Sequence, residues 1–177
     1  ITGFHVAGFW TAVFGSILAF AKMSKYKVLR WPVTLFIELI RGTPILLQLY
    51  IGYFIVPQMF PALGLSDFAS ICVALIINSS CYVSEVVRSG IQAVDHAQDE
   101  AARSLGLSHW QSMLRVVLPQ AVKNILPALG NEFVMIIKET SLASTFFIGD
   151  LMTSYLVVKG KTWLSLESLL IVGVIYF

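Results

Sequence analysis

Long apolar segments alternate with short polar ones along the chain, and the apolar segments predict transmembrane helices. A helix needs about 20 mainly apolar residues to cross a hydrocarbon core of roughly 30 Å. Five segments are candidates for such spans: 3–21, 33–56, 68–87, 121–138 and 164–177. The pattern therefore predicts an all-α, polytopic membrane protein with five transmembrane helices.

Two of these segments carry further local signals. In the first, small residues recur at three- and four-residue steps, a spacing that lets membrane helices approach closely: Gly8, Ala12, Gly15 and Ala19. In the second, Gly42 and Pro44 interrupt the apolar stretch. Pro lacks a backbone N–H and clashes with the preceding turn, so we expect this helix to kink or break there.

The longest polar stretch, residues 98–119, predicts a helix, a turn and a second helix, which together we call the elbow. Asp99 and Glu100 are suited to a first helical turn, where acidic side chains complement the helix dipole. Ala101 and Ala102 are strong helix formers, so a short helix is expected over 98–105.

The end of this helix and the start of the next are also marked. Gly106 is suited to the left-handed residue that ends a helix, and Ser108 is suited to cap a second helix that begins near His109. Pro119 opens the next apolar run, where a missing N–H is harmless in a first turn.

Basic residues indicate which side of the membrane holds the elbow. With five spans and an outside start, the inner segments carry eight of them: Lys22, Lys25, Lys27, Arg30, Arg88, Arg103, Arg115 and Lys123. The outer segments carry Lys159 and Lys161. Because cytoplasmic segments are enriched in Lys and Arg, the elbow is expected in the cytoplasm.

Composition agrees with a membrane protein and argues against some partners. Hydrophobic residues make up 57% of the 177 residues and charged residues only 12%, with a mean hydropathy of +0.81. The net charge of +2 comes from dispersed basic residues, so nucleic acid is not an expected partner. The chain begins without Met inside one apolar run and stops inside another. We therefore expect a single membrane domain, 1–177, with both ends truncated.

The elbow and two flanking segments resemble a known family. Glu100-Ala101-Ala102, then Gly106, then Leu118-Pro119 is similar to the EAA loop of ATP-binding-cassette importer permeases. Segments 38–44 (Glu-Leu-Ile-Arg-Gly-Thr-Pro) and 138–142 (Lys-Glu-Thr-Ser-Leu) are similar to signatures of the polar amino acid permease subfamily. The resemblance covers nearly the whole chain.

This resemblance implies a type I importer permease of the bacterial inner membrane, in which the elbow is the coupling helix. The implied partners are two ABC ATPase subunits, a second permease subunit that is the same or different, and an extracytoplasmic solute-binding protein that delivers an amino acid. ATP and Mg would be held by the ATPase and no cofactor by this chain. The residues assigned to ATPase coupling on this basis are Asp99, Glu100, Ala101, Ala102, Gly106, Leu118 and Pro119.

Ionisable and amide side chains inside apolar segments suggest two roles, because such groups are costly in lipid. Structural ion pairs are predicted between Glu38 and Arg41, Glu85 and Arg88, and Lys138 and Glu139. Contact with a zwitterionic substrate along a translocation path is the alternative role. The candidates for that path are Asn78, Glu85, Asn131 and Glu132.

Catalysis and metal binding have little support in the sequence. The three histidines have no metal-ligand spacing and no adjacent nucleophile motif. Gly160-Lys161-Thr162 fails as a phosphate-binding loop, because Tyr155 stands where the first Gly should be, and we interpret it as a plain turn. Two other functions stay open: a secondary transporter or channel that needs no ATPase, and a membrane scaffold whose elbow recruits a soluble partner.

Overall fold

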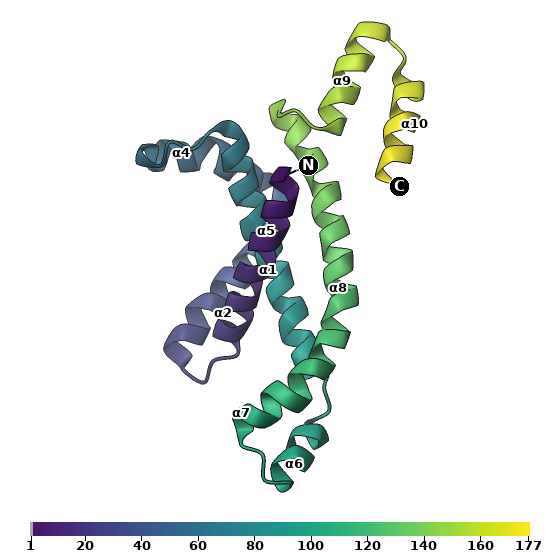
Figure 1. Ribbon diagram of the computed structural model, residues 1–177. Coiled ribbons are helices and arrows are strands. Elements are labelled where there is room, and N and C mark those ends of the chain that lie inside the picture. Colours follow the sequence, from purple (N-terminus) through teal and green to yellow (C-terminus); the bar gives the residue numbers. More distant parts are fainter. Residues whose placement is uncertain (1) are drawn as a thin grey trace. The chain divides into compact units, whose positions relative to one another are not determined.

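The computed structural model describes the backbone of residues 2–177 and the side chains of residues 8–177, and every regular element in this part is helical. The α-helices, shown in Figure 1, are α1 (Thr2–Lys22), α2 (Lys27–Arg41), α3 (Ile45–Tyr50), α4 (Val56–Met59), α5 (Asp67–Gln92), α6 (His96–Ser104), α7 (His109–Ser112), α8 (Leu118–Glu139), α9 (Leu151–Thr162) and α10 (Ser165–Tyr176). The predicted all-α class is confirmed.

Short π and 3₁₀ segments join several of these helices. The π-helical turn Ile51–Ile55 continues α3 into α4, and a second one, Met113–Val117, continues α7 into α8. The 3₁₀ segments are Pro61–Leu63 and Thr140–Phe146. Pro119 is therefore the second residue of α8, but α8 continues a preceding helical turn instead of starting a separate helix.

The predicted interruption of the second apolar stretch is confirmed. Helix α2 ends at Arg41, and Gly42 caps it. Helix α3 begins at Ile45, with Pro44 in extended conformation at its N-cap. Pro at this position cannot continue the preceding helix, and it also disfavours helical geometry in the residue before it.

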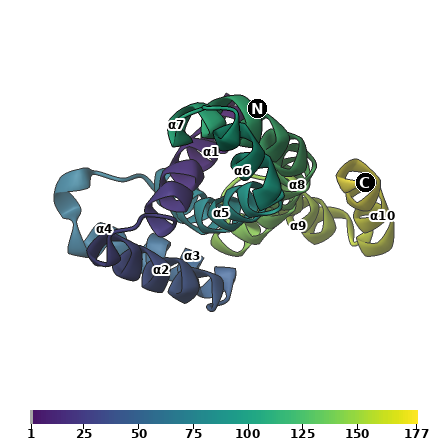
Figure 2. The ribbon, with the colours of Figure 1, turned by 90° about the horizontal axis from the view of Figure 1, so that it is seen from below.

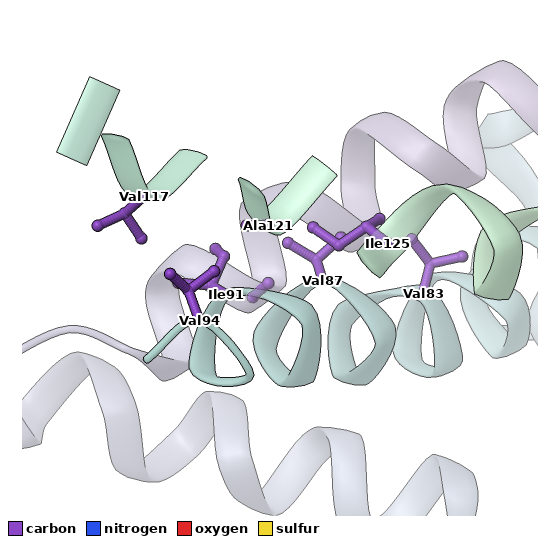
Figure 3. Close-up of a cluster of buried hydrophobic side chains, with 8 residues drawn as sticks. Val83, Val87, Ile91, Val94, Val117, Ala121 and Ile125 are labelled. Carbon is purple, nitrogen blue, oxygen red and sulfur yellow. The ribbon is translucent and has the colours of Figure 1, made fainter. Parts of the chain in front are cut away.

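The chain forms two compact units. The first contains Ile1–Gly42 and Ile76–Phe133, and the second contains Thr43–Leu75 and Val134–Phe177. In the first unit, buried apolar side chains form one cluster: Ala19, Val83, Val87, Ile91, Val94, Val117, Ala121 and Ile125. Figure 3 shows the row on α5 facing the row that runs from the π turn into α8. Three- and four-residue steps bring both rows onto single helix faces.

A close approach holds α1 against α5 in the same unit. A Cβ atom on Gly15 would lie 2.5 Å from Val83 Cγ1 and 3.0 Å from the carbonyl oxygen of Ser80. Ser80 Oγ also donates a hydrogen bond to the carbonyl oxygen of Thr11 at 3.5 Å. The small-residue spacing of the first apolar segment predicted a close helix approach, and the structure shows that α5 is the neighbour at Gly15.

The second unit has its own apolar cluster and its own helix pair. Leu49, Ile71 and Leu75 are buried together, and the ring of Phe146 packs against Tyr53 with centroids 4.8 Å apart. Helices α9 and α10 contact one another and lie side by side in Figures 1 and 2.

The structure leaves the number of spans between one and three. Among the described residues, α5 is the one helix that is long and apolar enough to cross a membrane alone. Two interrupted helix pairs would each add a span if counted as one: Lys27–Arg41 with Ile45–Met59, and His109–Phe146 with Leu151–Thr162. Five spans therefore remain a prediction, and so does the domain division based on them.

One local prediction was wrong. Gly160-Lys161-Thr162, predicted to be a plain turn, forms the last turn of α9. This helix is capped at its N-terminus, where the Asp150 side chain accepts a hydrogen bond from the Thr153 N–H at 2.6 Å. The glycine is tolerated because one Gly costs a helix only about 1 kcal/mol relative to Ala.

Candidate functional site

The elbow consists of α6, the turn at Gly106 and α7, which lie together at the lower end of Figure 1. Asp95 caps α6, and its carboxylate accepts a hydrogen bond from the Ala97 N–H at 3.0 Å. The helix thus starts two residues before the predicted 98, because Asp95 satisfies a free N–H in the first turn.

The turn and the second helix follow the predicted signals. Gly106 has φ +91°, a conformation that L side chains rarely adopt. Ser108 caps α7 in a reciprocal capping box: its hydroxyl accepts from the Gln111 N–H at 3.3 Å, and the Gln111 side chain accepts from the Ser108 N–H at 2.9 Å. The predicted start of this helix at His109 is confirmed.

Side-chain contacts fix the two arms of the elbow to one another. Ser112, which is fully buried, donates a hydrogen bond from Oγ to Asp99 Oδ1 at 2.5 Å. Ala102 is 5% exposed, whereas Glu100 and Ala101 on the same helix are exposed. Asp99 and Ala102 therefore serve the internal packing of the elbow, and Glu100 and Ala101 lie on its free side.

The free side of the elbow also carries large apolar groups. Leu105 is 83% exposed and Trp110 is 69% exposed. Exposed apolar side chains next to a charged residue are typical of a surface that contacts a partner.

The second arm passes directly into α8 at Leu118 and Pro119. The Leu118 N–H donates to the carbonyl oxygen of Met113, the wider hydrogen bond of a π turn. Gln120 Nε2 also donates to the Val116 carbonyl oxygen at 3.0 Å. Helical structure is therefore continuous from α7 through the π turn into α8.

A second group of polar residues surrounds Glu85 in the first unit, and we call it the Glu85 cluster. Lys22 Nζ lies 2.6 Å from Glu85 Oε1 and 3.0 Å from Glu38 Oε1. Arg88 donates from Nη2 and Nε to Glu85 Oε2, at 2.7 and 3.1 Å. Arg41 Nη1 lies 3.9 Å from the same oxygen. The ends of α1 and α2 are thereby tied to α5.

Arg41 extends this cluster towards other residues of the unit. Its guanidinium carbon lies 5.2 Å from the centre of the Tyr82 ring, within the range of a cation–π interaction. Arg41 thus contacts Glu85 and Tyr82 of α5 and lies at the end of α2.

The predicted ion pairs are only partly matched by this geometry. Glu85 and Arg88 form the predicted ion pair. Glu38 and Arg41 do not pair with one another: Glu38 contacts Lys22 on α1, and Arg41 contacts Glu85 on α5. Lys138 is exposed and Glu139 is partly buried at the end of α8, and their pairing stays a prediction.

The candidate path residues have different surroundings. Asn78 is 2% exposed, and the Glu85 side chain is 15% exposed and surrounded by cations. On α8, Asn131 is exposed and Glu132 is partly buried. Asn131 is thus the most accessible member of the set.

Two residues that stabilise these regions were missed by reasoning from sequence. Lys22 was interpreted only as a marker of topology, although it contacts both Glu38 and Glu85. No signal near Lys22 indicates this, because Glu85 is 63 residues away along the chain. Asp95 was detectable, since Asp immediately before a helix is a preferred N-cap.

Comparison with known proteins identifies the family of the chain. Residues 11–177 match the family described as "Binding-protein-dependent transport system inner membrane component". The chain belongs to this family. It is therefore a membrane permease component, and this class of subunit is not itself catalytic.

Individual relatives and solved structures are similar over most of their length. The arginine transport system permease protein ArtQ of Bacillus subtilis is 38% identical over 165 residues, covering 93% of this chain and 75% of the relative. The putative glutamine transport system permease protein GlnP of Rickettsia conorii is 38% identical over 172 residues, covering 97% and 78%.

A solved structure titled "Crystal structure of an amino acid ABC transporter with histidines" is 40% identical with a TM-score of 0.89, covering 99% of this permease and 81% of that chain. A structure of the MetNI methionine ABC transporter in an inward-facing conformation is similar in fold, with a TM-score of 0.75 at 16% identity. The superposition covers 99% of this chain and 85% of the MetNI chain.

Proposed function

We propose that this permease carries polar amino acids across the bacterial inner membrane, and that its elbow is the docking site for the ATPase that drives transport. The two relatives described are named for arginine and glutamine transport. The solved structure that is 40% identical to this chain is titled as an amino acid ABC transporter with histidines. The segments at 38–44 and 138–142, which resemble polar amino acid permease signatures, support the same substrate class.

The observation that carries the docking proposal is the division of the elbow into two sides. Asp99, Ala102 and Ser112 hold its arms together, while Glu100 and Leu105 face outwards. An exposed carboxylate and an exposed apolar side chain on one short segment suit a groove on a soluble subunit. The continuous helix through Leu118 and Pro119 would transmit the movement of that subunit to α8.

The complete transporter would contain two ATPases, a second permease and an extracytoplasmic binding protein, as the binding-protein-dependent family description suggests. ATP and Mg would lie on the ATPases. ATP binding would draw the ATPases together and move the elbows, which would open the path outwards. Hydrolysis would then return the path to its inward-open state. The elbow would lie in the cytoplasm, as the distribution of basic residues predicts.

Glu132 and Asn131 are our proposed substrate contacts on α8. Both are more accessible than Asn78, and neither is surrounded by cations as Glu85 is. A zwitterion that leaves water needs replacement partners for its ammonium and carboxylate groups. A carboxylate and an amide at neighbouring positions offer an acceptor for the ammonium group and a donor for the carboxylate.

The test is ATPase activity in proteoliposomes that contain the permease, its ATPase and its binding protein. Arginine, histidine, glutamine, glutamate and leucine are added one at a time. We expect stimulation by one or more of the four polar amino acids. Stimulation by leucine alone, or none by any of the five, would contradict the proposed substrate class.

The docking role is tested separately by Gly106→Asp. Gly106 is exposed, and no atom lies within 4 Å of a Cβ built there. Asp tolerates positive φ better than most residues, but any side chain at φ +91° is strained. The variant therefore adds a charge to the docking side together with backbone strain in the turn, and its control must share that strain. We expect normal membrane insertion and loss of ATPase co-purification or of substrate-stimulated turnover.

Gly64→Asp is the matched control for this variant, because Gly64 also has positive φ (+55°) and open space around it. It should leave binding of the ATPase unchanged. Unchanged ATPase binding and transport in the Gly106→Asp variant would refute the docking site but leave the substrate class untouched.

A further inference from the structure

A cleft of about 340 Å³ lies beside the Glu85 cluster in the first unit. It is formed by the end of α1, the first half of α2 and the end of α5, and its lining residues are Lys22, Met23, Arg30, Thr34, Arg88 and Gln92. Three of the six side chains are cationic and none is a carboxylate. This volume lies within the usual range for small-molecule sites, roughly 300–1,000 Å³.

The positive charge at this cleft is not fully neutralised by the protein. Glu85 and Glu38 are the carboxylates in contact with Lys22, and Glu85 also serves Arg88 and Arg41. Among the described side chains, no carboxylate lies within 4.0 Å of Arg30. Lys22, Arg88 and Arg41 therefore share two carboxylates, and Arg30 contacts none. The three cations that line the cleft and these two carboxylates leave a net charge of about +1, since each side chain carries one unit charge.

The lining also offers hydrogen-bond donors that suit a phosphate group. Arg30 presents a planar guanidinium with several N–H donors, and Thr34 adds a hydroxyl. Gln92 accepts from Arg88 Nη1 through its amide oxygen, which leaves its amide nitrogen as a donor. An anion with several acceptor oxygens would satisfy these groups together.

The surroundings of the cleft resemble a membrane surface. Tyr26 is 77% exposed and Trp31 is 71% exposed, and both flank Val28, which is 90% exposed. Tyr and Trp are enriched where the headgroups meet the acyl chains, and a basic pocket between helices on the cytoplasmic side suits an acidic lipid headgroup. A soluble anion has no acyl chains that could contact these exposed apolar side chains.

We propose that this cleft binds the headgroup of an anionic phospholipid of the inner leaflet. The phosphate would lie among Arg30, Arg88 and Thr34, and the acyl chains would extend along the apolar residues around Trp31. Such a lipid would join α1, α2 and α5 beside the Glu85 cluster, in addition to the direct ion pairs. The proposal does not depend on which substrate is transported.

Native mass spectrometry of the detergent-solubilised transporter complex would test this proposal, by titration with phosphatidylglycerol and, separately, with neutral phosphatidylcholine. Arg30→Gln is the main variant, because Arg30 lines the cleft without contributing to the Glu85 cluster. Lys25→Gln is the matched control, since Lys25 lies in the same basic segment and outside the lining. Thermal unfolding of each variant checks that its fold is retained.

We expect the wild-type complex to prefer phosphatidylglycerol over phosphatidylcholine. Arg30→Gln should weaken phosphatidylglycerol binding about fivefold, which corresponds to about 1 kcal/mol for one basic residue at a lipid surface. Lys25→Gln should leave it almost unchanged. Equal weakening by both variants would indicate a diffuse surface attraction and would overturn the site, as would no effect of Arg30→Gln.

A competition arm distinguishes a lipid from a free anion. Inorganic phosphate or glycerol 3-phosphate is added to the complex loaded with phosphatidylglycerol, at constant ionic strength. We expect little displacement, because neither competitor has acyl chains to contact the exposed apolar residues. Displacement at concentrations similar to that of the lipid would overturn the lipid assignment in favour of a soluble phosphate compound.

Discussion

Gly15→Ala tests whether α1 and α5 pack as closely as the structure indicates. The added Cβ would lie 2.5 Å from Val83 Cγ1, 2.7 Å from Val83 Cβ and 3.0 Å from the Ser80 carbonyl oxygen. Carbon atoms prefer separations of about 3.5–4.0 Å, so the first contact is short by about 1 Å. Because Val83 is 3% exposed and the Ser80 oxygen belongs to the helix backbone, neither has room to move away easily.

The expected cost follows from overpacking of a filled interior. Adding one methyl to a well-packed core typically costs about 1–3 kcal/mol, and substituting Gly by Ala within a helix returns up to about 1 kcal/mol. We therefore expect a net destabilisation of about 1–2 kcal/mol. The matched control is Gly130→Ala in α8, where no atom lies within 4 Å of the new Cβ. This control should be neutral or slightly stabilising.

The free energy of unfolding is measured by SDS titration of the detergent-solubilised protein for both variants. Combining Gly15→Ala with Val83→Ala should recover only a small part of the loss caused by the glycine substitution, because the contact with Val83 Cγ1 disappears while those with Val83 Cβ and the Ser80 oxygen remain. If Gly15→Ala behaved like Gly130→Ala, the close approach of α1 and α5 would be refuted.

Two further predictions concern the Glu85 cluster and the elbow. Glu85→Gln should destabilise the protein by about 2 kcal/mol, because Lys22 and Arg88 lose their shared carboxylate in a site that is only partly exposed. The control Glu167→Gln, at an exposed position, should change stability little. SDS titration measures both variants, and equal stabilities would contradict the central role of Glu85. Ser112→Ala should destabilise the folded elbow by about 1.5–3 kcal/mol, because the hydrogen bond to Asp99 is lost. It should also lower substrate-stimulated ATPase activity more than the control Ser104→Ala, whose hydroxyl donates a hydrogen bond only within its own exposed helix. Equal activity of these two serine variants would argue against a coupling role for the bond between the arms.

Local features were correctly predicted from the sequence because their causes lie within a few residues. The break before α3 follows from Gly42 and Pro44, and the start of α7 follows from the cap at Ser108. The left-handed turn at Gly106 has the same origin, since Gly adopts positive φ at little cost. A close helix approach at Gly15 was also predictable, because small residues along one helix face let a neighbouring helix come near.

Other features are less securely determined by local pattern. The number of spans depends on whether interrupted helices such as Lys27–Arg41 and Ile45–Met59 cross the membrane together, which apolar composition does not decide. The helix α9 was overlooked because its apolar and polar positions give no clear helical face, and the cap at Asp150 is a weak signal alone.

The tertiary structure decided which polar side chains meet. Glu38 and Arg41 are neighbours by helical spacing, yet packing of α1 and α5 against α2 gives each a different partner. Lys22 meets Glu85 across 63 residues of sequence. The same packing brings Arg30 and Arg88 to one cleft. Hydrophobic pattern and helix caps fix where helices begin and end because they act over one or two turns, whereas ion pairs and clefts depend on how whole helices pack.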